Sequence, residues 1–146
     1  MWSWARHDGA ARVLVRRLKY DAVPGVARLI ATELVEAVPS EAKCLVPVAR
    51  TLARRIRYGI DPAAVLATAL SGHCGLPVVH VLAAPVWVPA NAGAGRAQRR
   101  AVDFQTRRTV HGAVLVDDVA TTGTTLDAAG RALGGAIGAL TATRAL

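Results

Sequence analysis

Two adjacent carboxylates and a glycine flanked by threonines lie within one segment, residues 112–125. The segment reads Gly-Ala-Val-Leu-Val-Asp-Asp-Val-Ala-Thr-Thr-Gly-Thr-Thr, so an apolar run typical of a buried strand leads into small residues before a helix. In open α/β sheets, ligands bind at the carboxyl ends of the strands, and a helix N-terminus presents unpaired N–H groups to an anion. The pattern therefore predicts an anion site where this strand passes into the helix.

The residue types in this segment suit the two ends of a sugar phosphate. Gly123 would let the backbone approach phosphate oxygens. Hydroxyl donors around the same group would come from Thr121, Thr122, Thr124 and Thr125. Asp117 and Asp118 accept hydrogen bonds when ionised, so they suit the vicinal hydroxyls of a ribose, either directly or through Mg²⁺. Together these groups indicate a ribose 5-phosphate.

A plain strand-to-helix turn is the alternative interpretation of the same residues. In that case one aspartate caps the helix and the threonines are simply solvated. A cap explains one acid, but neither the second acid nor four threonines around one glycine.

Other common types of functional site fit this sequence poorly. The sequence has no GxxxxGK[ST] loop and no Gly-x-Ser-x-Gly elbow, and His73, Cys74 and His80 do not form a spaced metal-ligand set.

Strands that alternate with helices must position these residues. The apolar runs predict strands over 44–46, 78–82, 112–116 and 137–143. The helical periods predict helices over 10–19, 26–38, 50–57, 62–71 and 125–133. Asp61 and Pro62 have the form of an N-cap and first helical residue, and Gly72 is placed to end that helix. The fold class predicted is α/β, a parallel sheet flanked by helices, in one domain over 1–146 with a long loop over 83–111.

Composition and charge narrow the class of protein. The chain has 146 residues, 53% of them hydrophobic and 4% aromatic, and no apolar run of membrane-spanning length, so we expect a globular cytoplasmic protein. Cys44 and Cys74 are too few for a disulfide framework and are expected to be reduced. The net charge of +8, from 18 basic and 10 acidic residues, attracts phosphorylated metabolites and nucleic acids alike.

The segment Val114 to Thr125 resembles the phosphoribosyl pyrophosphate (PRPP) signature of type I phosphoribosyltransferases. More of the chain is similar to one branch, the ComF/GntX competence-associated family. The resemblance includes Asp8-Gly9, then Leu18-Lys19-Tyr20, then Val46-Pro47-Val48, in the family's order. The sequence departs from the family at residues 58–62, where only Gly59 is kept, and it contains no N-terminal paired CxxC zinc module.

The resemblance implies a type I phosphoribosyltransferase-like (Rossmann-like) fold whose hood comprises the N-terminal helices and the long loop. It also implies displacement of pyrophosphate from C1 of PRPP by a nucleophile, with Mg²⁺ as cofactor held by Asp117 and Asp118. These two acids would be the catalytic residues. The 5-phosphate loop would comprise Ala120, Thr121, Thr122, Gly123, Thr124 and Thr125. The pyrophosphate loop would comprise Val48, Ala49 and Arg50. Type I relatives are often dimers, so a homodimer is a further expectation.

A non-catalytic role is the second hypothesis. The same resemblance implies a competence or DNA-uptake accessory protein that binds single-stranded DNA or a helicase partner. Arg50, Arg54 and Arg57 recur on one helical face, and this strip is either a contact for a nucleic-acid backbone or a solvated surface. The long loop adds a second basic cluster of Arg96, Arg99, Arg100, Arg107 and Arg108, with Phe104 its sole interleaved aromatic. For Lys19 and Tyr20, a snorkelling lysine beside a half-buried tyrosine is the structural alternative to a functional role.

Overall fold

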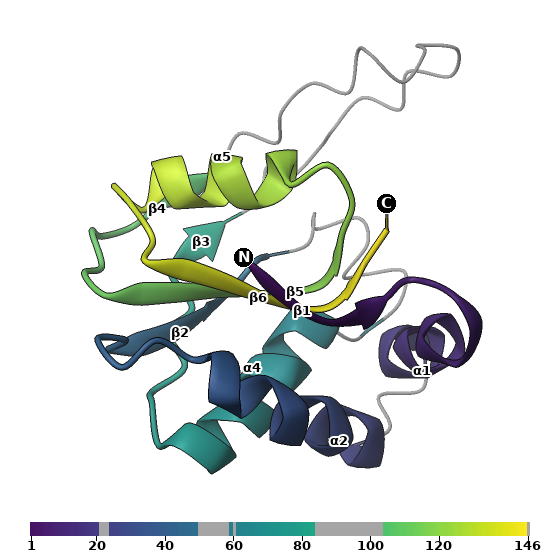
Figure 1. Ribbon diagram of the computed structural model, residues 1–146. Helices are drawn as coiled ribbons and strands as arrows, with labels where there is room; N and C mark the ends of the chain where they lie inside the picture. Colours follow the sequence, from purple (N-terminus) through teal and green to yellow (C-terminus); the bar gives the residue numbers. More distant parts are fainter. Residues whose placement is uncertain (21–23, 50–58, 60, 84–103, 146) are drawn as a thin grey trace, which may run out of the picture.

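The computed structural model describes residues 1–20, 24–49, 59, 61–83 and 104–145, and in this part of the chain a four-stranded parallel sheet is central (Figure 1). The strand order is β1-β6-β5-β2, with all neighbours parallel. The strands are β1 Trp2–Arg6, β2 Cys44–Pro47, β5 Ala113–Ala120 and β6 Gly138–Arg144. A separate antiparallel pair is formed by β3 Leu82–Ala83 and β4 Gln105–Thr106.

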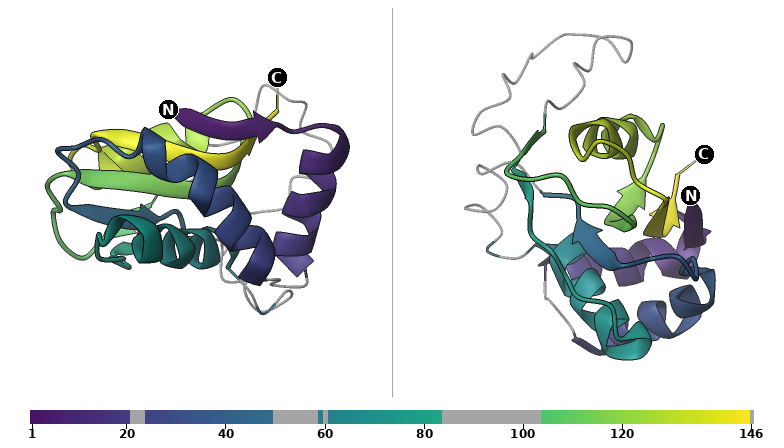
Figure 2. Two further views of the ribbon diagram at one scale, coloured as in Figure 1. Left: turned by 60° about the horizontal axis from the view of Figure 1, so that its bottom comes forward. Right: turned by 90° about the vertical axis from the view of Figure 1, so that its left-hand side faces the viewer.

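Helices cover both faces of the parallel sheet, as Figures 1 and 2 show. The helices are α1 Gly9–Tyr20, α2 Pro24–Leu34, the short 3-10 turn η1 Val35–Ala37, α4 Pro62–Cys74 and α5 Thr124–Ala132. On one face, α1, α2 and α4 bury an apolar cluster that includes Ile30, Leu66 and Val114. On the other, α5 packs over Leu115 and Val46. This arrangement confirms the predicted α/β class with a parallel sheet flanked by helices.

The apolar pattern explains why β5 is central. Ala113 to Val116 are at most 2% exposed, and the strand has a neighbour on each side, with Leu115 opposite both Val46 and Ala139. A continuous Val/Leu run of this kind is typical of a strand buried on both faces. Parallel strands end at the same edge, so the residues after β1, β6, β5 and β2 are brought together.

Several predicted bounds were wrong. β5 continues to Ala120, so both aspartates lie within the strand rather than after it. The helix predicted to end at Gly72 continues to Cys74, because Gly75 takes the left-handed conformation (φ +73°) that ends it. The helix predicted over 26–38 ends at Leu34 and passes into η1.

One strand prediction was wrong, and one strand was missed. The run 78–82 is not a continuous strand: Val78 makes an isolated parallel bridge to Leu45, and β3 begins only at Leu82. The strand β1 was not predicted.

The helix predicted over 50–57 and most of the loop 83–111 lie outside the described residues. None of the helices in the described ranges combines the length and apolarity needed to span a bilayer.

Candidate functional site

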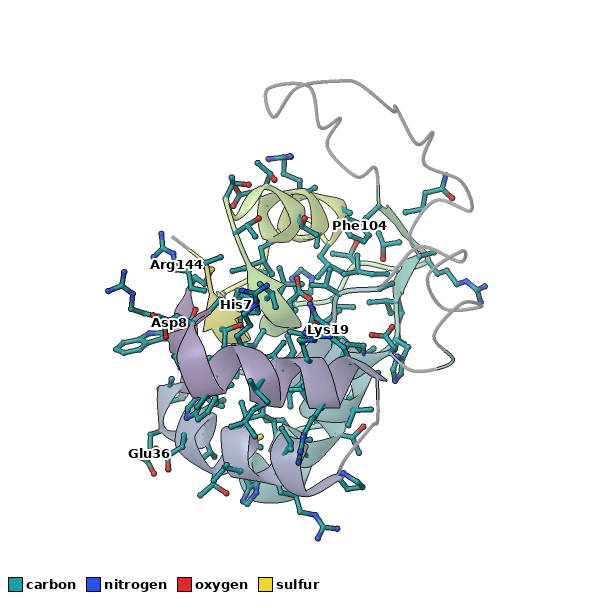
Figure 3. All side chains as sticks on the ribbon, turned by 90° about the vertical axis from the view of Figure 1, so that its right-hand side faces the viewer. His7, Asp8, Lys19, Glu36, Phe104 and Arg144 are labelled. Carbon is teal, nitrogen blue, oxygen red and sulfur yellow. The ribbon has the colours of Figure 1, made fainter. Side chains whose placement is uncertain are left out.

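The candidate site lies at the carboxyl edge of the sheet, where β1, β6 and β5 end beside the last turn of α1. Asp117 and Asp118 come from β5, His7 follows β1 directly, and Thr143 lies near the end of β6. Figure 3 shows His7 and Arg144 near the start of α1 and Lys19 toward its other end, on the side that faces the sheet. Groups distant in sequence therefore share one edge.

The two aspartates differ in what surrounds them. Asp118 is 7% exposed, and its Oδ2 lies 3.1 Å from the Lys19 ammonium nitrogen. The backbone N–H of Asp118 donates to Asp117 Oδ1 at 2.8 Å. Asp117 lies opposite Thr141 of β6 and is partly buried. One carboxylate is therefore paired with a cation, whereas the other is held by the backbone next to it.

The surroundings of Asp117 favour its protonated form. Burial raises the pKa of its carboxyl well above the ordinary value, and the neighbouring charge and side-chain hydrogen bond of Asp118 add to the effect. The Asp118 N–H and the Lys19 charge lower the same pKa by less. A protonated Asp117 can donate a hydrogen bond as well as accept one, so the acid pair can offer both kinds of partner to sugar hydroxyls.

His7 connects the end of β1 to the end of β6. Its Nδ1 shares a 2.7 Å hydrogen bond with Thr143 Oγ1, and its backbone N–H donates to the Arg144 carbonyl at 2.8 Å. Burial lowers the pKa of His7, and the positive charges of Lys19 and Arg12 lower it further. A neutral imidazole therefore lies beside the acid pair at physiological pH.

The turn between β5 and α5 has the form expected of an anion-binding loop. Gly123 has φ +82° and occupies the N-cap position of α5, and its carbonyl accepts the first helical bond from Asp127 at 2.9 Å. Thr122 Oγ1 and Thr124 Oγ1 are 2.9 Å apart. The exposed residues of the turn are Thr121, Thr122, Thr124 and Thr125. These threonines therefore lie at the surface at one helix N-terminus, where the first N–H groups of a helix have no intrahelical acceptors.

The two loops predicted to hold phosphate groups are anchored in one apolar cluster. Ala120 is 3% exposed and packs in the cluster beneath α5, together with Val48. The Val48 N–H donates to the Val116 carbonyl at 2.9 Å, and Ala49 is partly buried. The Ala120 side chain therefore fixes the base of its loop by packing. Arg50 lies outside the described residues, as do Arg54, Arg57, Arg96, Arg99 and Arg100.

His7 and Thr143 were not identified as site residues from the sequence. For Lys19, the sequence left open whether the residue has a functional role or only snorkels at the surface. An alternating pattern, with Trp2 and Trp4 on either side of Ser3, could have indicated β1 and hence a polar residue at its carboxyl end. The pairing of Lys19 with Asp118 has no local signal, because the two residues belong to elements far apart in the chain.

Carboxylate oxygens suit Mg²⁺, but the acid pair fits a bare ion poorly. Mg²⁺ sites in proteins use one or two carboxylates with several waters, and here the Lys19 ammonium already lies at an oxygen of Asp118. Within the described ranges, no three His, Cys, Asp or Glu side chains gather as a metal-ligand group. The residues therefore suit a cation that arrives with a phosphorylated ligand better than a resident ion.

No protein-family model matches the chain, and no curated protein matches it. Solved structures similar to it include a purine phosphoribosyltransferase from Pyrococcus horikoshii Ot3, with a TM-score of 0.40, 20% identity and coverage of 90% of this chain and 71% of that one. Another is a glutamic acid mutant from an analysis of an invariant aspartic acid in HPRTs, with a TM-score of 0.42, 15% identity and coverage of 90% and 66%.

Proposed function

We propose that this chain is a phosphoribosyltransferase-like protein that binds PRPP, or a related ribose 5-phosphate, at the carboxyl edge of its sheet. The observation that carries the proposal is the acid pair Asp117 and Asp118, followed within one short turn by the left-handed Gly123 at the N-terminus of α5. A ribose 5-phosphate has a diol and a phosphate separated by a few bonds. At this spacing, the carboxylates can bind the hydroxyls of the diol while the helix N-terminus binds the phosphate.

The reaction proposed is pentosyl transfer with release of pyrophosphate. A nucleophile forms a bond to C1 of the ribose while the bond from C1 to the pyrophosphate oxygen breaks, and the electron pair leaves with pyrophosphate. Positive charge develops on the ribose ring in the transition state, so nearby carboxylate charge stabilises it. Asp117 and Asp118 would orient the diol and the Asp118 carboxylate would supply that charge, while the turn over 121–125 holds the 5-phosphate.

The pyrophosphate end of the ligand would meet the loop that follows β2. Val48 anchors this loop through its N–H on the Val116 carbonyl, Ala49 would offer a backbone N–H group to pyrophosphate, and Arg50 stays the predicted cation. Mg²⁺, when bound with PRPP, would neutralise pyrophosphate charge. The acceptor nucleophile would be chosen by the N-terminal helices and the loop 83–111.

Calorimetric titration of PRPP, with Mg²⁺ and at moderate salt, tests the proposal. We expect saturable binding by the wild type and a loss of at least about tenfold in affinity for Gly123→Val. A β-branched side chain is strained at φ +82° and would shift the turn and obstruct the approach of phosphate.

Gly75→Val is the matched control. Gly75 has φ +73° and open space around it, like Gly123, but it ends α4 on another part of the molecule. This variant should carry the same kind of backbone strain and keep PRPP affinity. No binding by folded wild type, or an equal loss in both variants, would contradict the proposal.

A non-catalytic nucleic-acid-binding role is the second candidate, and one surface feature favours it. Arg12, Arg16 and Arg17 are exposed on α1. Exposed arginines along a helix can contact a phosphate backbone without reading its sequence. Single-stranded DNA is therefore the ligand to test if PRPP does not bind.

A further inference from the structure

The ion pair between Lys19 and Asp118 is mostly shielded from water. The Lys19 side chain is 26% exposed and the Asp118 side chain 10%, and the two charged groups are 3.1 Å apart. Asp118 also lies beside Asp117, so this one ammonium acts on both carboxylates, and its charge opposes the rise in the Asp117 pKa. A shielded carboxylate pair of this kind needs a nearby cation.

A lysine ammonium can donate to more than one acceptor. An ammonium carries three N–H donors, and the contact with Asp118 uses one of them. Because about a quarter of the side chain is exposed at the carboxyl edge of the sheet, a bound sugar can approach the same ammonium. The lysine can therefore hold Asp118 and donate to a ligand oxygen together.

The same ammonium opposes a divalent ion. A dication that took Asp118 as a ligand would stand within a few ångströms of the Lys19 charge, in a partly desolvated site where repulsion is weakly screened. The His7 imidazole faces Thr143 through Nδ1. The geometry thus favours one cation at the acid pair, and the chain supplies it.

We propose that Lys19 is the resident cation of the acid pair, which positions Asp118 and donates to the ribose hydroxyls, so that binding of a ribose 5-phosphate needs no divalent ion. The ligand part of this inference rests on the proposed function. The cation part concerns the protein alone and can be tested without any sugar.

The first experiment measures binding of Mn²⁺ to the ligand-free protein by electron paramagnetic resonance. Mn²⁺ takes oxygen ligands as Mg²⁺ does, and it is directly detectable. We expect Lys19→Met to bind at least about tenfold more tightly than wild type, because removal of the ammonium frees the carboxylates for the ion. Adding Asp118→Asn to Lys19→Met should abolish the gain, and this double variant removes both members of the ion pair, so neither is left as a shielded charge without the other.

Lys43→Met is the control for loss of one positive charge. Lys43 is exposed and precedes β2, with its N–H on the Gly112 carbonyl at the opposite end of the sheet. It should bind Mn²⁺ as wild type does. If Lys19→Met binds no better than Lys43→Met, the resident-cation inference is wrong.

The second experiment titrates ribose 5-phosphate with EDTA or with Mg²⁺. Wild type should bind with the same affinity, within about twofold, in both buffers. Lys19→Met should lose about tenfold or more in EDTA and recover part of it with Mg²⁺, while Lys19→Arg should keep most of the affinity because it retains charge and donors. Binding by wild type that requires Mg²⁺ would overturn the inference. If wild type does not bind ribose 5-phosphate at all, the proposed function and the ligand part fail together, and the Mn²⁺ result still decides the cation part.

Discussion

Asp117 and Asp118 are adjacent in sequence, yet the fold gives them different surroundings. Successive side chains of a strand start toward opposite faces of the sheet, but the Asp117 carboxyl turns back to the Asp118 N–H at 2.8 Å, so the two acids stay adjacent. Asp118 meets Lys19 of α1, on the face that α2 and α4 also cover, whereas Asp117 lies opposite Thr141 in the sheet. The pair therefore combines a carboxylate fixed by a cation with a carboxyl whose raised pKa favours the proton. Because of this difference, we expect the two amide variants to change the stability of the protein in opposite directions.

Asp117→Asn should stabilise the protein at neutral and alkaline pH. The raised pKa means that the folded chain binds this proton more tightly than the unfolded chain, so wild-type stability falls as the pH rises above the ordinary aspartate value. The amide has no such charge to bury. Thermal unfolding at several pH values should show a higher Tm for the variant at pH 8, with a difference that vanishes toward pH 4. A variant less stable than wild type at pH 8 would contradict this reasoning.

Asp118→Asn should instead lower the stability of the protein. Loss of this carboxylate leaves Lys19 without its partner at a site that is only 26% exposed on the lysine side. We expect a loss of about 1–3 kcal/mol in the free energy of unfolding, less than for a fully buried pair because the ammonium can partly rehydrate. Urea denaturation at pH 7 measures it. Equal stability of the variant and wild type would show that the ion pair does not contribute.

At the scale of elements, the unit from β5 to α5 was predictable because its parts are contiguous. The Val-Leu run, the two acids, the turn glycine and the following helix are read along one segment, and each has a local signal. The predicted helix over 125–133 lies within a residue of α5 at each end. The assignment of residues 120–125 as a phosphate loop stays a proposal, as does their ligand.

The parts that the sequence did not reveal depend on long-range pairing. β1 is short and joins the sheet beside β6, the last strand of the chain, so its register depends on residues at the other end. The Ser3 and Thr141 hydroxyls share a 2.7 Å hydrogen bond across this pair. The positions of His7 and Lys19 follow from β1 and α1 packing there. No local hydrophobic periodicity encodes such contacts, so the sequence could not predict that His7 and Lys19 lie at the carboxyl edge of the sheet.

The two ends of the β5–α5 unit should respond differently to the same substitution. Gly112 (φ +67°) precedes β5, and a Cβ there would lie 2.9 Å from Lys43 Cγ and 3.3 Å from the Glu41 carbonyl oxygen. Gly123 (φ +82°) has open space around it. We expect Gly112→Ala to cost about 2–4 kcal/mol, from positive φ and steric overlap together, and Gly123→Ala about 1–2 kcal/mol from φ alone.

Chemical denaturation of both variants checks this prediction. Similar losses in the two would show that the crowding at Gly112 relaxes through movement of the flexible Lys43 side chain. Gly123→Ala should also be mild enough in stability for its ligand affinity to be measured, which separates the role of the turn in binding from its role in folding.

At the scale of the whole molecule, the positive charge is not confined to the candidate site. The chain carries a net charge of +8, and α1 exposes Arg16 and Arg17 to solvent. Such a field attracts any polyanion, and salt weakens it over a distance of about 8 Å at physiological ionic strength. The proposed contacts of PRPP with the turn and the acid pair would be local, so they should depend less on this field than the contacts of an extended nucleic acid.

Reversal of two surface charges therefore distinguishes the two candidate functions. For Arg16→Glu with Arg17→Glu, we expect PRPP affinity at 0.15 M salt to change by less than about threefold, because both side chains point into screening solvent. If α1 binds single-stranded DNA, the slope of log affinity against log salt should become shallower by about 1.4, at about 0.7 for each phosphate that the variant no longer neutralises. Fluorescence anisotropy across a salt series measures that slope. An unchanged slope would exclude this face of α1 as a DNA-binding surface, and a large drop in PRPP affinity would mean that the ligand extends over α1, beyond the site proposed at the carboxyl edge of the sheet.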